Sequence, residues 1–169
     1  FPKEISVDEI VPHLPGCSAL RPSKTHPSLL DALNEKGEVL GLIGRTSPHA
    51  DSIVGYQGPS DTLVGFGPEG RFAGLTLQKT YDNEEYAVYL REDEYYPAQF
   101  KGLTLAELAG LDWLAEGIDG VSGSTLISNS VTEGMVLAAQ AERAASNEPA
   151  LNWRSRDIGT ALVVLFGLV

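Results

Sequence analysis

Apolar and polar positions along the chain first alternate over short runs, as strands do, and later recur with helical spacing. Two hairpins are predicted in the first half, one around the turn at 35–37 and one around the turn at 68–70. Glycine and proline punctuate both regions, which is typical of turns. The predicted strands are 28–34, 38–46, 60–66 and 71–80.

Helical spacing dominates the second half of the chain. Thr104 and Glu107 have the spacing of a capping box, which marks a helix start. The predicted helices are 6–13 (capped by Ser6), 84–93, 104–109 and 125–145, the last with Val131, Met135, Leu137 and Ala138 toward the core. Strands followed by helices indicate an α+β fold, an antiparallel sheet with helices packed mainly on one face.

The chain is long enough for one domain with a substantial core, because it has 169 residues. Its formal net charge is −11, so binding to the phosphate backbone of nucleic acids is excluded as its function. Acidic residues concentrate at 82–85 and 92–94, close to four tyrosines. A solvated helix face is the simpler interpretation, and a docking patch for a basic redox partner is the alternative.

The sequence gives little indication of a metal site or of a nucleotide-binding motif. There is a single cysteine, Cys17, so no internal disulfide forms and no Cys pair has zinc or iron–sulfur spacing. The histidines, His13, His26 and His49, are scattered, and no glycine-rich dinucleotide or P-loop signature occurs. We predict no metal site and no catalytic acid–base pair.

The segment 119–125, DGVSGST, stands directly before the longest predicted helix. A helix N-terminus offers unpaired N–H groups and the positive end of the helix dipole, which suits a phosphate. Gly123 allows close approach of the backbone to an anion, and the Thr125 hydroxyl is a group that can be esterified. An ordinary N-cap is the alternative, since Ser and Thr are favoured there.

This segment resembles the flavinylation motif of FMN-binding domains in bacterial respiratory proteins. Asp119, Ser122, Gly123, Ser124 and Thr125 occupy the constrained positions. Such domains occur in NosR-like regulators of nitrous oxide reductase, in Rnf complexes and in sodium-translocating quinone reductases. The commonest form of the motif has alanine where this chain has Ser124, a change that keeps the attachment hydroxyl.

The resemblance implies that Thr125 carries FMN through a phosphoester, installed by a flavin transferase that uses FAD. Ser122, Gly123 and Ser124 would wrap the phosphate. Asp119 would support the loop or help bind a metal during transfer. FMN moves electrons singly or in pairs, so the expected function is electron transfer by a carrier domain rather than by a stand-alone enzyme.

The glycine-rich region 51–70 also resembles the NosR-like branch, through a G-Y-x-G-P segment before a short apolar strand. The segment 100–103, FKGL, matches the F-x-G-L that precedes the motif, and the likeness extends over 28–146. The alternative is that the glycines and the proline of this loop only form the turns of a hairpin. The residues expected near the flavin ring are Gly55, Tyr56, Gly58 and Pro59, with Tyr56 as a stacking partner.

The last residues complete the domain assignment. We assign 1–150 to the FMN-binding domain and 151–169 to a linker and the start of a transmembrane helix. Residues 158–169 are twelve apolar or small residues, fewer than the roughly 20 that span a bilayer, so a buried strand or short core helix is the alternative. Arg154 and Arg156 before them weakly favour a cytoplasmic flank, against the family's outer-face placement.

The resemblance decides the localisation that we expect, an inner-membrane protein with its domain on the periplasmic side. The expected partners are membrane-bound iron–sulfur or haem proteins, or a quinone system. A second hypothesis keeps the fold without redox chemistry, as a membrane-tethered sensor or scaffold whose acidic face binds a partner.

Overall fold

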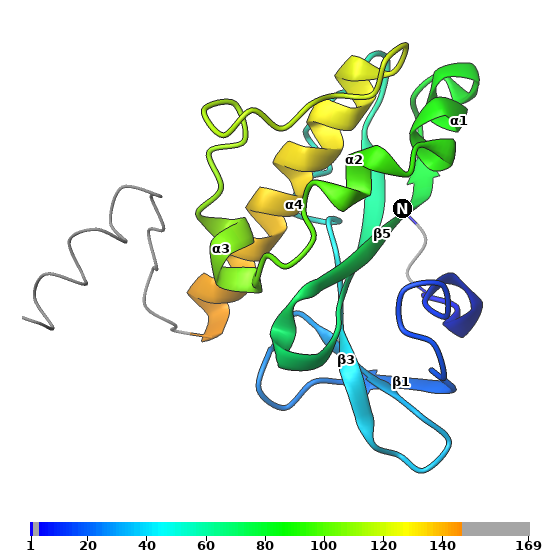
Figure 1. The fold of residues 1–169 in the computed structure, drawn as a ribbon, viewed down its shortest axis with the longest axis vertical. Helices are drawn as coiled ribbons and strands as arrows, with labels where there is room; N and C mark the ends of the chain where they lie inside the picture. The colour runs from blue at the N-terminus through cyan, green and yellow to red at the C-terminus, as the bar shows by residue number, and fades with distance from the viewer. Residues whose placement is uncertain (2–3, 147–169) are drawn as a thin grey trace, which may run out of the picture.

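The structure is a computed structural model that describes residue 1 and residues 4–146 (Figure 1). Five strands form one sheet in the order β1-β2-β3-β4-β5, and every neighbouring pair is antiparallel. The α+β prediction is therefore confirmed. The elements are η1 (Val7–Glu9), β1 (Ala19–Pro22), β2 (Leu30–Leu33), β3 (Val39–Arg45), β4 (Ser60–Phe66), η2 (Pro68–Gly70), β5 (Phe72–Thr80), α1 (Glu84–Glu92), α2 (Tyr95–Ala98), α3 (Leu105–Ala109) and α4 (Thr125–Ser146).

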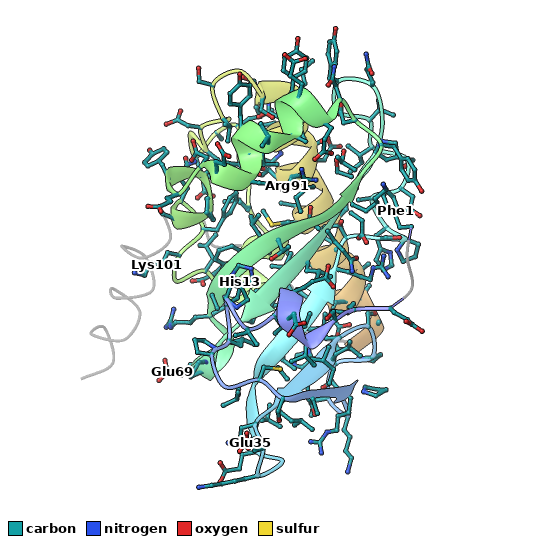
Figure 2. The ribbon with its side chains drawn as sticks, turned by 90° about the vertical axis from the view of Figure 1, so that its right-hand side faces the viewer. Phe1, His13, Glu35, Glu69, Arg91 and Lys101 are labelled. Atoms are coloured by element: carbon teal, nitrogen blue, oxygen red, sulfur yellow. The ribbon has the colours of Figure 1, made fainter. Side chains whose placement is uncertain are left out.

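Both faces of the sheet are covered. The α-helices pack on one face, and the N-terminal segment with η1 lies on the other (Figure 2). Strand β4 is buried along its whole length for this reason. Its Val64 and Phe66 belong to the core beneath the α-helices, and Leu63 belongs to the smaller core beneath η1.

Helix α4 is the longest element and positions the site described below. Val131 and Met135 are buried as predicted, but the prediction that Leu137 faces the core is wrong, because its side chain is 36% exposed. At 3.6 residues per turn, Leu137 lies about 200° around the helix from Met135. Val136 and Ala139 are buried on the core side instead.

Two elements were not predicted from the sequence, and two are shorter than predicted, one of them β2, which covers Leu30–Leu33 of the predicted 28–34. Strand β1 lies at the sheet edge, where its Pro22 is tolerated. Helix α2 is four residues long, too short for a periodic pattern. The predicted helix at 6–13 is the 3₁₀ turn η1, although its Ser6–Glu9 capping box forms.

The remaining helix predictions agree with the structure to within a residue or two at each end. The Thr104–Glu107 capping box opens α3. No helix within residues 4–146 is long and apolar enough to cross a bilayer. The membrane segment predicted at 158–169, and the domain boundary at 150, lie outside the described residues.

Candidate functional site

The segment before α4 makes a tight turn into the helix. The Ser124 backbone N–H donates to the Val121 carbonyl, 2.9 Å away. Gly123 has φ +79°, the value that the third residue of a type II turn requires and that favours glycine. The glycine of the motif therefore has a local conformational role of its own.

Ser128 fixes this turn to the first turn of α4. Its buried hydroxyl accepts a hydrogen bond from the Val121 N–H at 2.9 Å. The same hydroxyl lies within donating distance of the carbonyls of Ser124 (3.1 Å) and Thr125 (3.0 Å). Because loop and helix share one buried hydroxyl, the start of α4 has a defined shape without any ligand.

The start of α4 exposes a group of unpaired backbone donors. Within the part of the chain that the structure describes, five backbone N–H groups around this turn have no acceptor. They belong to Ser122, Gly123, Thr125, Leu126 and Ile127. Unpaired N–H groups and the helix dipole make this end of α4 electropositive, so it suits an anion.

Two hydroxyl groups of the motif differ in their surroundings. Thr125 is exposed, and its Oγ1 donates to the Val121 carbonyl at 3.2 Å. Ser124 is only 3% exposed, and its Oγ finds no hydrogen-bond partner among the described residues. A buried hydroxyl without a partner is uncommon in native structures and indicates a place where a ligand or water completes the bonding.

Two tyrosines stand beside the helix start. The rings of Tyr56 and Tyr86 meet edge to face, with centroids 5.6 Å apart and planes at 88°. Together with the beginning of α4 they enclose a cavity of about 350 Å³. We call it the polar cavity; its lining residues are Tyr56, Tyr86, Gly123, Ser124, Thr125, Leu126 and Ile127.

The loop that carries Tyr56 is held by a buried carboxylate. Asp82, 8% exposed, accepts the backbone N–H groups of Tyr56 (2.6 Å), Gln57 (2.9 Å) and Asn83 (2.8 Å). Three bonds to one charged acceptor fix the loop relative to the start of α1. Tyr56 therefore stands on a preformed support, although its own ring is 52% exposed.

The loop glycines are explained by contacts within the protein. A Cβ on Gly55 would lie 2.3 Å from Asp82 Oδ2 and 3.2 Å from Ile127 Cα, and one on Gly58 would lie 2.4 Å from the Tyr81 carbonyl oxygen. Gly55, Gly58 and Pro59 do not line the polar cavity. These glycines let the loop pack against its neighbours, so of the four predicted loop residues only Tyr56 lines the cavity.

Asp119 and Ser122 lie outside the lining as well. The Gln99 side chain makes two hydrogen bonds to the Asp119 backbone: it accepts the N–H at 2.8 Å and donates to the carbonyl at 3.0 Å. The exposed Asp119 carboxylate accepts the Tyr95 hydroxyl at 3.4 Å. Asp119 thus attaches the loop before α4 to the α2 region. Ser122 is exposed at the outer side of the turn.

Sequence reasoning missed Tyr86 and Asp82 as residues of this site, because both lie in an acidic run interpreted as a solvated face. Leu126 and Ile127 were also missed. An aspartate two residues after a strand and opposite a glycine loop is a signal for an N–H acceptor. No lysine or arginine lines the polar cavity. An anion there would be bound by backbone N–H groups and hydroxyls.

Comparison with known proteins does not assign the chain to a family. No protein-family model matches it, and no curated protein is significantly similar in sequence. The resemblance to FMN-binding domains rests on the residues of the motif and of the glycine loop.

Proposed function

We propose that this protein is an electron-transfer flavoprotein that carries FMN through a phosphoester to Thr125. One observation carries the proposal. The exposed Thr125 hydroxyl, a helix start with unpaired N–H groups and a tyrosine pair all border the same cavity. An anionic phosphate and a flat aromatic ring are the two parts of FMN that such a cavity suits.

The residues of the polar cavity fit the cofactor in three respects. Its backbone donors and the unpartnered Ser124 hydroxyl suit the phosphate. Its two tyrosine rings, one of them half exposed, suit the isoalloxazine ring. Its volume of about 350 Å³ lies within the range of small-molecule sites, with one side open to solvent for the rest of the ring.

Thr125 supplies the attachment chemistry. Its oxygen loses the hydroxyl proton and forms a new bond to phosphorus, while the bond to the AMP portion of the donor FAD breaks; no oxidant or reductant is needed. Thr125 is exposed at the helix start, so a transferase can reach it. The bond to the Val121 carbonyl orients the hydroxyl before attachment.

The bound FMN supplies transfer of one or two electrons. The chain itself binds, orients and partly shields the cofactor. No carboxylate, imidazole, ammonium or guanidinium group lines the polar cavity, which supports a carrier role rather than turnover of a substrate. Membrane-bound iron–sulfur, haem or quinone partners on the periplasmic side of the inner membrane remain part of the proposal, and the sequence resemblance supports them.

The test is retention of the flavin after denaturation. The protein is co-expressed with a flavin transferase, precipitated in acid, washed and redissolved in denaturant. We expect flavin absorbance with wild type and with Thr125→Ser, which keeps a hydroxyl, and none with Thr125→Ala. Loss of the colour from wild type on precipitation, or its retention by Thr125→Ala, would contradict the proposal. A wild-type protein that never acquires flavin would favour the non-redox sensor or scaffold.

A further inference from the structure

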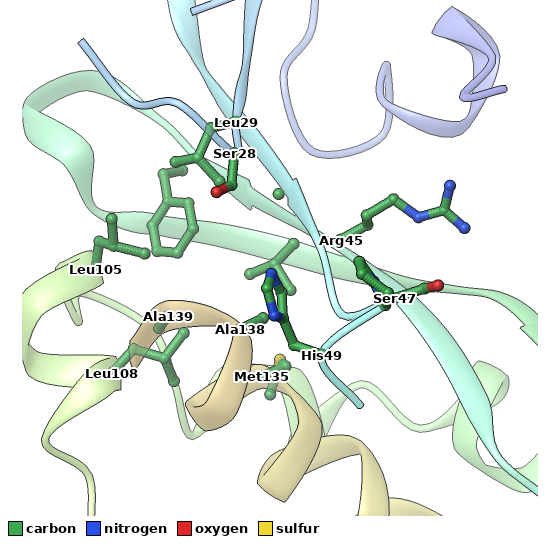
Figure 3. Close-up of a pocket in the computed structure, with 14 residues that line it drawn as sticks. Ser28, Leu29, Arg45, Ser47, His49, Leu105, Leu108, Met135, Ala138 and Ala139 are labelled. Atoms are coloured by element: carbon green, nitrogen blue, oxygen red, sulfur yellow. The ribbon is translucent and has the colours of Figure 1, made fainter. Parts of the chain in front are cut away.

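A second cavity, of about 310 Å³, lies between the end of β3, helix α3 and the later turns of α4 (Figure 3). We call it the apolar cavity. It shares no lining residue with the polar cavity. Its lining residues are Ser28, Leu29, Gly44, Arg45, Ser47, Pro48, His49, Val64, Phe66, Leu105, Leu108, Met135, Ala138 and Ala139.

The volume at this place needs an explanation. Protein interiors pack as densely as organic crystals, yet this cavity extends from an exposed edge at Pro48 and His49 to the buried side chains of Val64 and Phe66. Here the helix-to-sheet interface opens where α4 presents the small side chains Ala138 and Ala139. The facing walls are leucines and Phe66, and with Met135 of α4 they give water few partners. An apolar guest fits such walls better than water does.

Two polar groups stand at the exposed edge of the cavity, because Ser28 and His49 are both exposed residues. The His49 ring and the Ser28 hydroxyl are turned toward the cavity, whereas the Arg45 guanidinium points away from it (Figure 3). No residue within 4–146 makes a hydrogen bond to the His49 ring or to the Ser28 hydroxyl. Both groups are therefore available to a guest.

Buried carboxylates hold the two loops that present these groups. Asp61, fully buried, accepts the Ser47 N–H at 3.0 Å and pairs with Arg45, which fixes the loop before His49. Glu142, 1% exposed, accepts the Ser28 N–H at 2.8 Å. The cavity mouth is thus preformed, as binding sites for small molecules usually are.

We propose that the apolar cavity binds a small, uncharged aromatic molecule that carries one hydroxyl or carbonyl group. The size limits the guest to about one ring with a short substituent. The apolar walls, with Phe66 and the Met135 thioether, favour an aromatic body. The guest is uncharged because the Arg45 charge is paired with Asp61 and directed away. Its polar group bonds to His49 or Ser28.

The probes are 4-methylphenol and toluene, which have similar shapes and differ by the hydroxyl. Met135 is the only methionine of the chain, so a protein labelled with ¹³C at the methionine methyl gives one reporter signal. We expect 4-methylphenol to shift this signal in a saturable way with Kd of about 1 mM or tighter, and to show direct proton contacts to the methyl. Toluene is expected to bind more weakly.

Three variants test the location. Ala138→Phe fills the cavity and is expected to weaken 4-methylphenol binding at least tenfold, while Ala144→Phe, at an exposed position of the same helix, leaves it unchanged. The double variant His49→Phe, Ser28→Ala is expected to remove the preference for 4-methylphenol over toluene, and a preference that persists in the folded double variant would overturn the assignment of these two groups. Absence of saturation at about 10 mM, or of contacts to the Met135 methyl, would overturn the proposal. Undiminished binding by a folded Ala138→Phe variant would overturn it as well.

Discussion

The polar and apolar cavities have similar volumes, about 350 and 310 Å³, and opposite chemistry. The polar cavity is made by backbone donors at the start of α4 and by two tyrosines, Tyr56 on a loop held by Asp82 and Tyr86 in helix α1. The apolar cavity is made by residues from the middle of α4 and from four other parts of the chain. One long helix therefore contributes its terminus to one site and its small residues to the other.

The contrast predicts different tolerance to added atoms. Beside the polar cavity, the backbone at Gly55 leaves no room for a Cβ, which would meet the fixed Asp82 carboxylate and the Ile127 backbone. Around the apolar cavity, flexible side chains border empty space. A glycine-to-alanine change is therefore expected to lower stability strongly beside the polar cavity and only slightly beside the apolar cavity.

The largest expected effect is the difference in stability between the Gly55→Ala and Gly44→Ala variants. The new methyl at Gly55 would overlap a carboxylate oxygen at 2.3 Å, so the free energy of unfolding falls by about 2 to 3 kcal/mol. At Gly44 the contact is Leu29 Cδ2 at 2.9 Å, the free end of a side chain that can move into the apolar cavity. We expect a change within about 1 kcal/mol there.

Urea unfolding of both variants and of wild type measures this difference. Equal destabilisation of the two variants would show that the Gly44 region is packed as tightly as the Gly55 loop. The account of the apolar cavity would then fail.

A somewhat smaller effect compares two aspartates near the polar cavity. Asp82→Ala removes the acceptor of three backbone N–H groups, one of them from Tyr56, and should lower stability by about 2 kcal/mol. Asp119→Ala loses one long contact to the Tyr95 hydroxyl at the surface, so we expect a change of about 0.5 kcal/mol or less. Denaturant unfolding checks both values, and a reversed order would refute the assignment of Asp82 as the loop's support.

The smallest effect concerns Tyr96, which is buried against α4 between the two cavities. Its hydroxyl donates to the Ser128 carbonyl at 2.7 Å and lies 2.8 Å from Thr132 Oγ1. Tyr96→Phe should cost about 1 kcal/mol at neutral pH. Binding of the two proposed ligands should be unchanged, since Tyr96 lines neither cavity.

The effect of Tyr96 should depend on pH. Burial raises the pKa of Tyr96 above its ordinary value near 10. The contribution of the neutral hydroxyl is then complete below pH 10 and is lost as the pH rises toward the folded-state pKa. The stability gap between wild type and Tyr96→Phe should shrink between pH 9 and pH 11 in urea titrations. If the difference in unfolding free energy widens between pH 9 and pH 11, the pKa of Tyr96 is not raised on folding.

Local patterns made much of the fold predictable from the sequence. The short apolar run at 62–66, the Thr104–Glu107 box and the periodicity after Thr125 each depend on neighbours a few residues away. Strand β1 and Leu137 were not predictable in this way, because edge pairing and the rotation of a helix against its sheet depend on tertiary packing.

The same distinction applies to the two sites. The turn at Gly123 and the hydroxyls of Ser124 and Thr125 lie within one short segment, so the motif was visible in the sequence. The approach of Tyr86 to Tyr56, and the opening beside Ala138, arise only when distant segments pack together. The sequence contains no local pattern for either.

The central claim is that Thr125 is the residue that carries FMN, and peptide mapping tests it most directly. Wild-type protein from cells with an active flavin transferase is digested, the peptide that absorbs in the visible range is isolated, and its modified residue is located by tandem mass spectrometry. The account predicts one FMN per chain, attached through phosphate to Thr125. An FMN located on Ser122 or Ser124, or a chain that carries none, would contradict it.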